Sequence, residues 1–312
     1  MNPHRLIVRA PIAARADLAG RRMIVTGAAP GSLGFETAAA LAAWGASVVV
    51  TTRSNPQAAV EALQARLPHG KARLAGHPLD LSRADSVARF AAWYAAEHGA
   101  LDVLVNNAGV HLDLLSQWKE PQLTADGLEI HWRTNYLGTA HLTGRLLPLL
   151  RQTAAARGGA RIVNVSSMLH RRGSNALLFA PQPRYHSWTA YGLSKLALIH
   201  YSFELQRRHA AEGVQAYCLH PGAVYTNIAD KGLAGSPRIA AVRKALAPVE
   251  RLFLLTAEEG AQTQLHCATH PGAEGGRYYL KCRPAQPGAD ALDTTVSSRL
   301  WRETEEWIER QP

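Results

Sequence analysis

Seven short apolar runs alternate along this 312-residue chain with longer segments of helical character. Each run is rich in β-branched or other apolar residues throughout, which is typical of strands buried on both faces of a parallel sheet. The runs lie at residues 23–27, 47–53, 72–80, 101–109, 161–167, 214–222 and 277–282. Because strands and helices alternate without a break in composition, the pattern predicts one doubly wound α/β domain with about seven parallel strands and helices on both faces.

The N-terminal segment and the cysteines indicate the cellular environment of this domain. We expect residues 1–20 to form an N-terminal extension and residues 21–312 to form the domain. The extension has no apolar run long enough for a signal peptide or a membrane anchor. The three cysteines, Cys218, Cys267 and Cys282, have neither metal-ligand spacing nor the pattern of a disulfide framework. These features predict a soluble, cytoplasmic protein without a membrane anchor or a metal site.

The formal net charge of +10 raises the question of an anionic partner. The basic residues are scattered, and their tightest groups are pairs such as Arg21-Arg22. A nucleic-acid groove needs a basic stripe interleaved with aromatic residues, and the sequence contains no such stripe. We therefore expect no nucleic-acid partner, but a basic surface and a site for a small anionic ligand.

The segment TGAAPGSLGFETA, residues 26–38, joins the first predicted strand to the first predicted helix. Its glycines are Gly27, Gly31 and Gly34, so the last interval is one residue longer than in the commonest dinucleotide-binding turn. In such a turn the first glycine permits the tight bend, the next lets the backbone approach a pyrophosphate, and the last lets the helix pack close to the strand. We interpret the segment as a lengthened phosphate-binding turn of a Rossmann fold, with a purely structural glycine turn as the alternative.

The start of the helix supplies the groups that would bind phosphate. The backbone N–H groups at a helix N-terminus lack intrahelical acceptors and face a positive dipole end. Pro30 has no N–H group, so the donors would come from Gly31, Ser32 and Leu33.

The end of the second predicted strand bears on the choice of dinucleotide. An NAD site would place an acidic residue there for the ribose hydroxyls. The stretch VVVTTRSN has Arg53 and no acid. A guanidinium can pair with a ribose 2′-phosphate through charge-assisted hydrogen bonds. Arg53 therefore favours NADP over NAD, the alternative being an ordinary exposed arginine.

The most specific chemical signal is Tyr191-Gly-Leu-Ser-Lys195. A tyrosine and a lysine four positions apart share one face of a helix. A phenol ordinarily titrates near ~10, and a neighbouring ammonium is expected to lower the pKa of Tyr191 toward the range useful for proton exchange. Ser167 ends the fifth strand, where its hydroxyl could hold a substrate oxygen beside Tyr191.

Together these motifs resemble the short-chain dehydrogenase/reductase family over about residues 20–310. The motifs that carry the resemblance are TGAAPGSLG, Asp80-Leu81, Asn106-Asn107-Ala108-Gly109, Asn135, Ser167, Tyr191 with Lys195, and PGAVYT at 221–226. More narrowly, NVSSMLH and LHPGAVYTNI are similar to the branch of retinol dehydrogenases and WW-domain oxidoreductases. His111, directly after NNAGV, departs from the family pattern, as does the longer glycine turn.

The resemblance implies a role for each matching residue. Tyr191 would be the general acid/base, Lys195 would lower its pKa and hold the nicotinamide ribose, and Ser167 would orient the substrate oxygen. Asn135 would hold a water that links Lys195 to solvent. The further cofactor-binding residues would be Asp80, Leu81, Asn107, Ala108, Gly109, Pro221, Gly222, Val224 and Thr226. For each position the alternative is ordinary packing of a helix or loop.

The expected function is an NADP(H)-dependent oxidoreductase that transfers a hydride between nicotinamide and an aldehyde, ketone or alcohol. NADPH is usually kept reduced in cells, so reduction of an apolar carbonyl substrate is the expected direction. The alternative is an NADPH-binding regulatory or scaffolding protein without useful turnover.

Two long segments are expected to shape the choice of substrate. Lid segments near 170–190 and 227–255 would cover the substrate, or else would cover core or a subunit contact. Relatives often pair through the helices near 128–150 and 191–210, which implies a homodimer or homotetramer.

Overall fold

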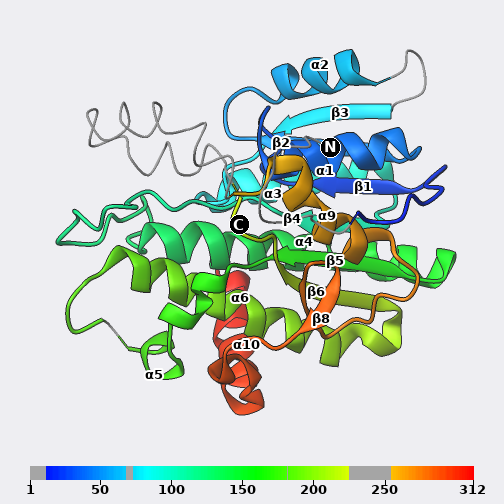
Figure 1. Cartoon of the computed structure of the whole chain (residues 1–312). Coiled ribbons are helices and arrows are strands. Elements are labelled where there is room, and N and C mark those ends of the chain that lie inside the picture. Colours follow the sequence, from blue (N-terminus) through cyan, green and yellow to red (C-terminus); the bar gives the residue numbers. More distant parts are fainter. Residues whose placement is uncertain (1–11, 68–72, 181, 225–253) are drawn as a thin grey trace.

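The computed structural model describes residues 12–67, 73–180, 182–224 and 254–312 (Figure 1). In these residues an eight-stranded sheet has the order β3-β2-β1-β4-β5-β6-β7-β8. The strands are β1 (Arg22–Val25), β2 (Ser47–Thr52), β3 (Arg73–Pro78), β4 (Val103–Asn106), β5 (Ala160–Val165), β6 (Val214–His220), β7 (Tyr278–Leu280) and β8 (Arg283–Ala285).

Strands β1 to β7 pair in parallel, and β8 pairs antiparallel with β7. The predicted doubly wound α/β fold with seven parallel strands is therefore confirmed. The prediction missed β8, because a three-residue strand of Arg, Pro and Ala carries no apolar pattern.

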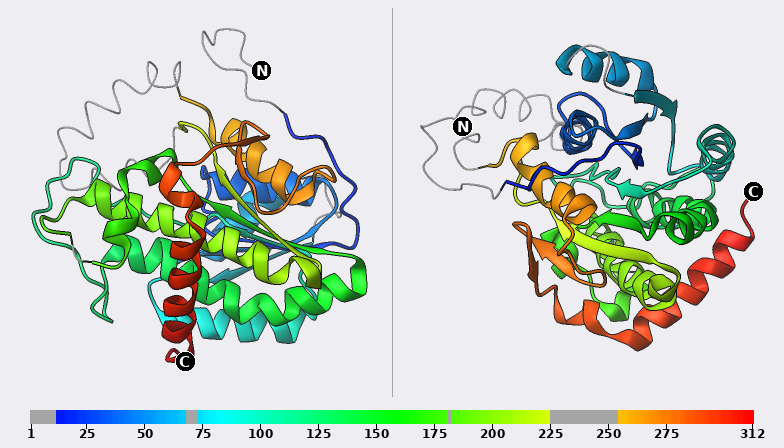
Figure 2. Two further views of the ribbon diagram at one scale, coloured as in Figure 1. Left: turned by 90° about the horizontal axis from the view of Figure 1, so that it is seen from below. Right: turned by 90° about the vertical axis from the view of Figure 1, so that its right-hand side faces the viewer.

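Helices cover both faces of the sheet (Figure 2). Helices α1 (Leu33–Ala43), α2 (Pro56–Arg66) and α9 (Ala257–Thr269) contribute to one core layer. Helices α3 (Ala84–His98), α4 (Gly138–Arg157) and α6 (Ser187–His209) contribute to the other. The remaining helices are η1 (Trp132–Leu137), η2 (Met168–Arg172), α5 (Asn175–Leu178), η3 (Ala210–Glu212), η4 (Ala289–Leu292) and α10 (Thr294–Glu309).

Alternate residues of a strand belong to opposite core layers. In β1, Met23 and Val25 face the layer of α1 and α9, whereas Ile24 faces the layer of α3 and α4. All three side chains are at most 2% exposed. Because both faces of the strand are covered, nearly every position must be apolar, which explains the continuous apolar runs.

The strand order places a crevice at the carboxyl edge of the sheet. Chain order runs from β1 to β3 on one side, and from β4 onward on the other. The reversal between β1 and β4 is the topological switch point at which doubly wound folds bind ligands. Thr26, Asn107, Ser166 and Pro221 follow β1, β4, β5 and β6 at this edge.

Helix α10 lies across the outer side of the layer formed by α4 and α6 (Figure 2). The ring of Trp301 stacks on Tyr201 with centroids 5.1 Å apart. The hydroxyls of Tyr136 and Thr304 lie 2.5 Å apart. Pairing of two chains was predicted through α4 and α6. Helix α10 of the same chain therefore covers part of the face that such pairing would use.

The predicted lid segments are described only in part. Residues 170–180 and 182–190 contain part of η2, all of α5 and the start of α6. In the segment 227–255, residues 227–253 lie outside the described part of the chain. Val224 and Leu255, on either side of this stretch, form a parallel bridge. Where the chain is described, it contains no helix that is both long and apolar enough to cross a membrane.

Candidate active site

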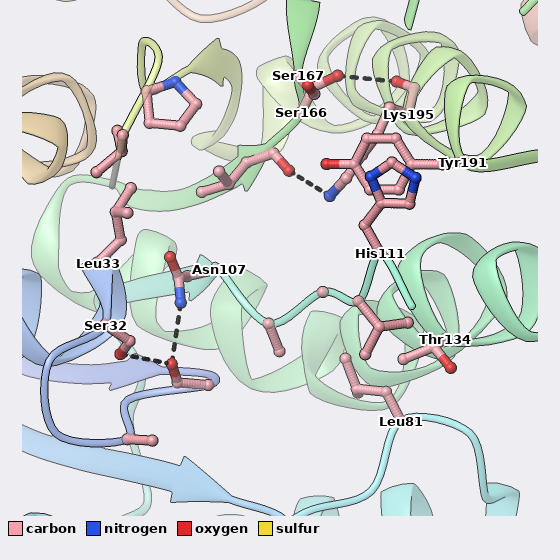
Figure 3. Close-up of a pocket in the computed structure, with 18 of the residues that line it drawn as sticks. Ser32, Leu33, Leu81, Asn107, His111, Thr134, Ser166, Ser167, Tyr191 and Lys195 are labelled. Carbon is pink, nitrogen blue, oxygen red and sulfur yellow. Dashed lines mark hydrogen bonds between the residues drawn. The ribbon is translucent and has the colours of Figure 1, made fainter. Parts of the chain in front are cut away.

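A pocket of about 350 Å³ lies at the carboxyl edge of the sheet (Figure 3). The predicted site residues that line it are Gly27, Ser32, Leu33, Arg53, Asp80, Leu81, Asn107, Ala108, Gly109, Ser167, Tyr191, Lys195, Pro221, Gly222 and Val224. Gly31, Gly34 and Asn135 are not among the lining residues, and Thr226 is outside the described residues. The fold thus brings motifs from distant parts of the chain to one cavity.

At each glycine position of the phosphate-binding turn, a side chain would be sterically unfavourable. Gly27 and Gly31 have φ angles of +69° and +78°, in the left-handed region that favours glycine. A Cβ at Gly34 would lie 2.5 Å from Nδ2 of Asn107 and 2.7 Å from the Gly27 oxygen. The last glycine therefore permits close packing of α1 against the turn, as the sequence predicts.

Side chains fix the turn from two directions. Asn107 Nδ2 donates to the backbone oxygens of Thr26 at 2.9 Å and Gly27 at 3.2 Å. Ser32 Oγ donates to the Gly27 oxygen at 3.1 Å and accepts from the Phe35 N–H at 3.1 Å. The hydroxyl of Ser32 is thus used within the turn. The Ser32 N–H, one of the three predicted phosphate donors, also bonds within the turn, to the Ala29 oxygen at 3.0 Å. The first N–H groups of a helix such as α1 lack intrahelical acceptors, which suits the phosphates of a dinucleotide.

The far end of the pocket fits the adenosine portion of such a ligand. Exposed Arg53 lines the pocket beside Thr52. The Thr52 hydroxyl is buried and has no hydrogen-bond partner in the described part of the chain. The Asp80 carboxylate accepts hydrogen bonds from the Ser82 N–H at 2.9 Å and the Ser82 hydroxyl at 2.6 Å, which holds it at the rim.

Ser167, Tyr191 and Lys195 meet at the other end of the pocket (Figure 3). Ser167 follows β5, and its Oγ accepts from the Leu169 N–H at 3.2 Å. Lys195 is 4% exposed. Its Nζ donates to the Val165 oxygen at 2.9 Å and lies 5.8 Å from the centroid of the Tyr191 ring.

The pKa of Tyr191 differs from the expectation. Burial raises it to about 12, and hydrogen bonding with Ser167 acts in the opposite direction. Burial also lowers the pKa of Lys195 to about 8. The expected lowering of the phenol's pKa by the ammonium does not dominate in this structure, because Lys195 Nζ bonds to a backbone oxygen and both groups are buried.

Asn135 acts on the loop that follows β4. It lies in the π-helix η1, a rare distortion often found at functional sites. Its Oδ1 accepts from the Val110 N–H at 2.7 Å, and its Nδ2 donates to the Val110 oxygen at 2.9 Å. A Cβ at Gly109 would lie 3.3 Å from both Asn135 Oδ1 and Lys195 Nζ, so the two polar groups approach the same glycine.

The sequence analysis did not assign three histidines at the site, of which His220 lines the pocket at the end of β6. The ring of His111 stacks on Tyr191 with centroids 4.4 Å apart and planes 12° apart (Figure 3). His170 Nδ1 lies 2.6 Å from the Ser167 oxygen, and its Nε2 accepts from the Gly288 N–H at 2.7 Å. His111 was noted only as a departure from a motif, and His170 belongs to NVSSMLH, whose contacts depend on residues far along the chain.

Comparisons with known proteins agree with this geometry. The family model described as short chain dehydrogenase matches residues 21–235. Retinol dehydrogenase 11 of Homo sapiens is 36% identical over 288 residues, which cover 91% of this chain and 85% of that protein. A crystal structure of an uncharacterised protein from Mycobacterium paratuberculosis has a TM-score of 0.69 and 30% identity, covering 96% of each chain.

A further solved structure is the Pseudomonas aeruginosa RhlG/NADP active-site complex. It has a TM-score of 0.61 and 26% identity, and covers 88% of this chain and 98% of that one.

A glycine turn at the switch point of a doubly wound sheet, facing a Ser–Tyr–Lys set, defines a nicotinamide-dependent oxidoreductase. The chain belongs to the short-chain dehydrogenase/reductase family. Within it, the chain falls in the retinol-dehydrogenase-like branch. Members of the family transfer a hydride between a nicotinamide cofactor and CH–OH or C=O groups, so the chain is an oxidoreductase of this type.

Proposed function

We propose that this protein is an NADPH-dependent carbonyl reductase in which Tyr191 is the general acid, Ser167 orients the substrate oxygen and Lys195 supports both. The observation that carries the proposal is the convergence of these three residues with the nucleotide turn in one pocket. A bound nicotinamide supplies the hydride, and the protein supplies orientation and electrostatics.

Side chains of this protein would bind and protonate the substrate oxygen. Donors from Ser167 and Tyr191 favour the negative charge that develops on that oxygen in the transition state over the neutral carbonyl. The high pKa of the buried Tyr191 keeps its proton in place until the oxygen becomes basic. Lys195 is held by the Val165 oxygen, from where its ammonium can stabilise a phenolate after proton transfer. Asn135 fixes the adjoining loop through Val110.

NADPH is the proposed cofactor because of Arg53. Arg53 lines the pocket next to the Thr52 hydroxyl, which has no hydrogen-bond partner among the described residues, and no acidic side chain ends β2. A 2′-phosphate would pair with the guanidinium and accept from a hydroxyl. The similar RhlG structure is an NADP complex. Dependence on NADPH, which cells keep reduced, favours carbonyl reduction.

The proposed substrate is an apolar aldehyde or ketone. The aliphatic side chains of Val110 and Leu112 line the pocket near Tyr191. Several relatives are named as retinol dehydrogenases, which suggests a hydrophobic substrate for this chain as well. The segment 170–190 is proposed to cover the substrate, whereas residues 227–253 of the second predicted lid lie outside the described part of the chain.

Turnover of a carbonyl panel by the wild type and Tyr191→Phe tests this function. We expect the wild type to oxidise NADPH with apolar aldehydes or ketones, and Tyr191→Phe to lose at least about 10³-fold in kcat while binding NADPH as tightly. Cofactor binding is measured by NADPH fluorescence, and NADH serves as the comparison for the role of Arg53.

Each outcome has a distinct meaning. A wild type that binds NADPH but reduces no carbonyl would indicate a cofactor-binding regulatory protein on the same fold. Equal efficiency with NADH would contradict the role given to Arg53. Faster turnover of small polar aldehydes than of bulky apolar ones would contradict the apolar substrate.

A further inference from the structure

The backbone around His111 is fixed by side chains on both sides. The preceding residue, Val110, exchanges two hydrogen bonds with the amide of Asn135. The following residue, Leu112, donates its N–H to His131 Nε2 at 3.2 Å. His131 is itself held, because its Nδ1 lies 2.7 Å from the Glu129 carboxylate. The imidazole of His111 therefore projects from a constrained position.

The ring of His111 lies among aromatic neighbours. It stacks on Tyr191 with planes 12° apart. It meets the rings of Trp188 and His131 edge-on, at centroid distances of 5.4 Å and 5.6 Å. His111 is 3% exposed and lines the pocket. His131 also meets the Tyr191 ring edge-on, at a centroid distance of 6.1 Å. A phenol held between these two imidazoles has little freedom to rotate about its side-chain bonds.

We infer that His111 is a positioning residue that fixes the ring plane of Tyr191 by face-to-face stacking, so that the phenol hydroxyl stays directed at Ser167 and the substrate oxygen. The inference rests on the proposed role of Tyr191. It gives a function to the residue at which this chain departs from the family motif. An error of about 1 Å in the position of a catalytic group can cost on the order of 10²-fold in rate.

The contact acts through shape and not through charge. Burial, together with the nearby His131 and Lys195, lowers the pKa of His111 to about 4, so the imidazole is neutral near pH 7. Its Nε2 is buried and has no hydrogen-bond partner among the described residues. An unpaired buried nitrogen lowers stability, and a phenyl ring in its place would avoid that cost while keeping the stack.

Two substitutions separate stacking from mere filling of space. His111→Ala removes the ring, whereas His111→Phe restores an aromatic face without a nitrogen. The control is His266→Ala, which removes another stacked imidazole, on His270 at 4.5 Å, away from the pocket. Hydride transfer is measured in single turnover with enzyme in excess over NADPH.

We expect His111→Ala to lower the rate of hydride transfer at least about tenfold without changing the Kd for NADPH, and His111→Phe to recover most of the loss. His266→Ala should match the wild type. Equal losses in the Ala and Phe variants, or no loss in either, would overturn the inference.

A second readout does not depend on turnover. Absorbance at 295 nm follows ionisation of Tyr191, taken as the difference between each variant and its Tyr191→Phe counterpart. Removing the imidazole admits water to a phenol whose pKa burial raises to about 12, so the phenol of His111→Ala should ionise at lower pH. The ionisable groups around the imidazole, Lys195, His131 and Asp113, remain in both variants. An unchanged titration in His111→Ala would contradict the stack even if no carbonyl is reduced.

Discussion

Lys195 shows how a functional side chain lowers stability at the scale of one residue. Its ammonium is almost fully buried, and burial lowers its pKa from 10.5 to about 8. A shift of this size corresponds to a loss of about 3 kcal/mol in the free energy of unfolding when the lysine is charged in both the folded and the unfolded protein. Its hydrogen bond to the Val165 oxygen offsets only part of this cost.

Lys195→Met is therefore expected to raise the free energy of unfolding by about 2 kcal/mol at pH 7 while abolishing turnover. Below pH 8 both the folded and the unfolded wild type hold the lysine proton, and the full cost is present. Between pH 8 and 10.5 the folded state releases the proton first, so the cost disappears as pH rises.

Urea unfolding of both proteins at pH 7 and pH 10 checks this prediction. The stability gap between Lys195→Met and the wild type should narrow at the higher pH. A gap of constant size at both pH values would mean that the buried charge is not its cause.

At the scale of elements, the contact between the glycine turn and α1 positions the phosphate donors. Gly34→Ala would push Cβ into Asn107 Nδ2 and the Gly27 oxygen. We expect the Kd for NADPH to rise at least about tenfold and the free energy of unfolding to fall by about 1–3 kcal/mol, because the helix must move away from the turn.

Gly144→Ala is the matched control within α4. Its Cβ would meet Ile308 at 3.6 Å, an ordinary contact. It should raise stability by about 0.5–1 kcal/mol through helix propensity and leave NADPH binding unchanged. Tight NADPH binding by Gly34→Ala in fluorescence titration would show that the lengthened turn does not depend on this contact.

At the scale of the whole molecule, α10 determines which helix faces remain available for contact with a second copy of the chain. Trp301 is 7% exposed and stacks on Tyr201 of α6. Pairing of two chains through the part of α6 that α10 covers would require this helix to move. We therefore expect the wild type to sediment as a monomer of 33.8 kDa, unlike the dimer or tetramer that the resemblance implied.

Trp301→Ala should lower the free energy of unfolding by about 3–5 kcal/mol and expose the apolar face of α6, which promotes association. Analytical ultracentrifugation and thermal unfolding measure the two effects. A wild-type dimer that Trp301→Ala dissociates would show instead that α10 forms a subunit interface.

Local patterns were enough to predict the seven parallel strands, the glycine turn and the spacing of Tyr191 and Lys195. The spacing of apolar residues within a short segment indicates whether the segment is a strand or a helix and which of its faces is buried. The alternation of β and α predicted a doubly wound parallel sheet, whereas the order of the strands came only from the structure.

Tertiary structure decided the pKa values of Tyr191 and Lys195, the stack of His111 on Tyr191 and the covering of α6 by α10. Each depends on groups far apart in the chain, and burial is a sum over all of them. A four-residue spacing can place an ammonium beside a phenol. Only the packed fold determines whether the ammonium or the burial of the phenol has the larger effect on the phenol's pKa.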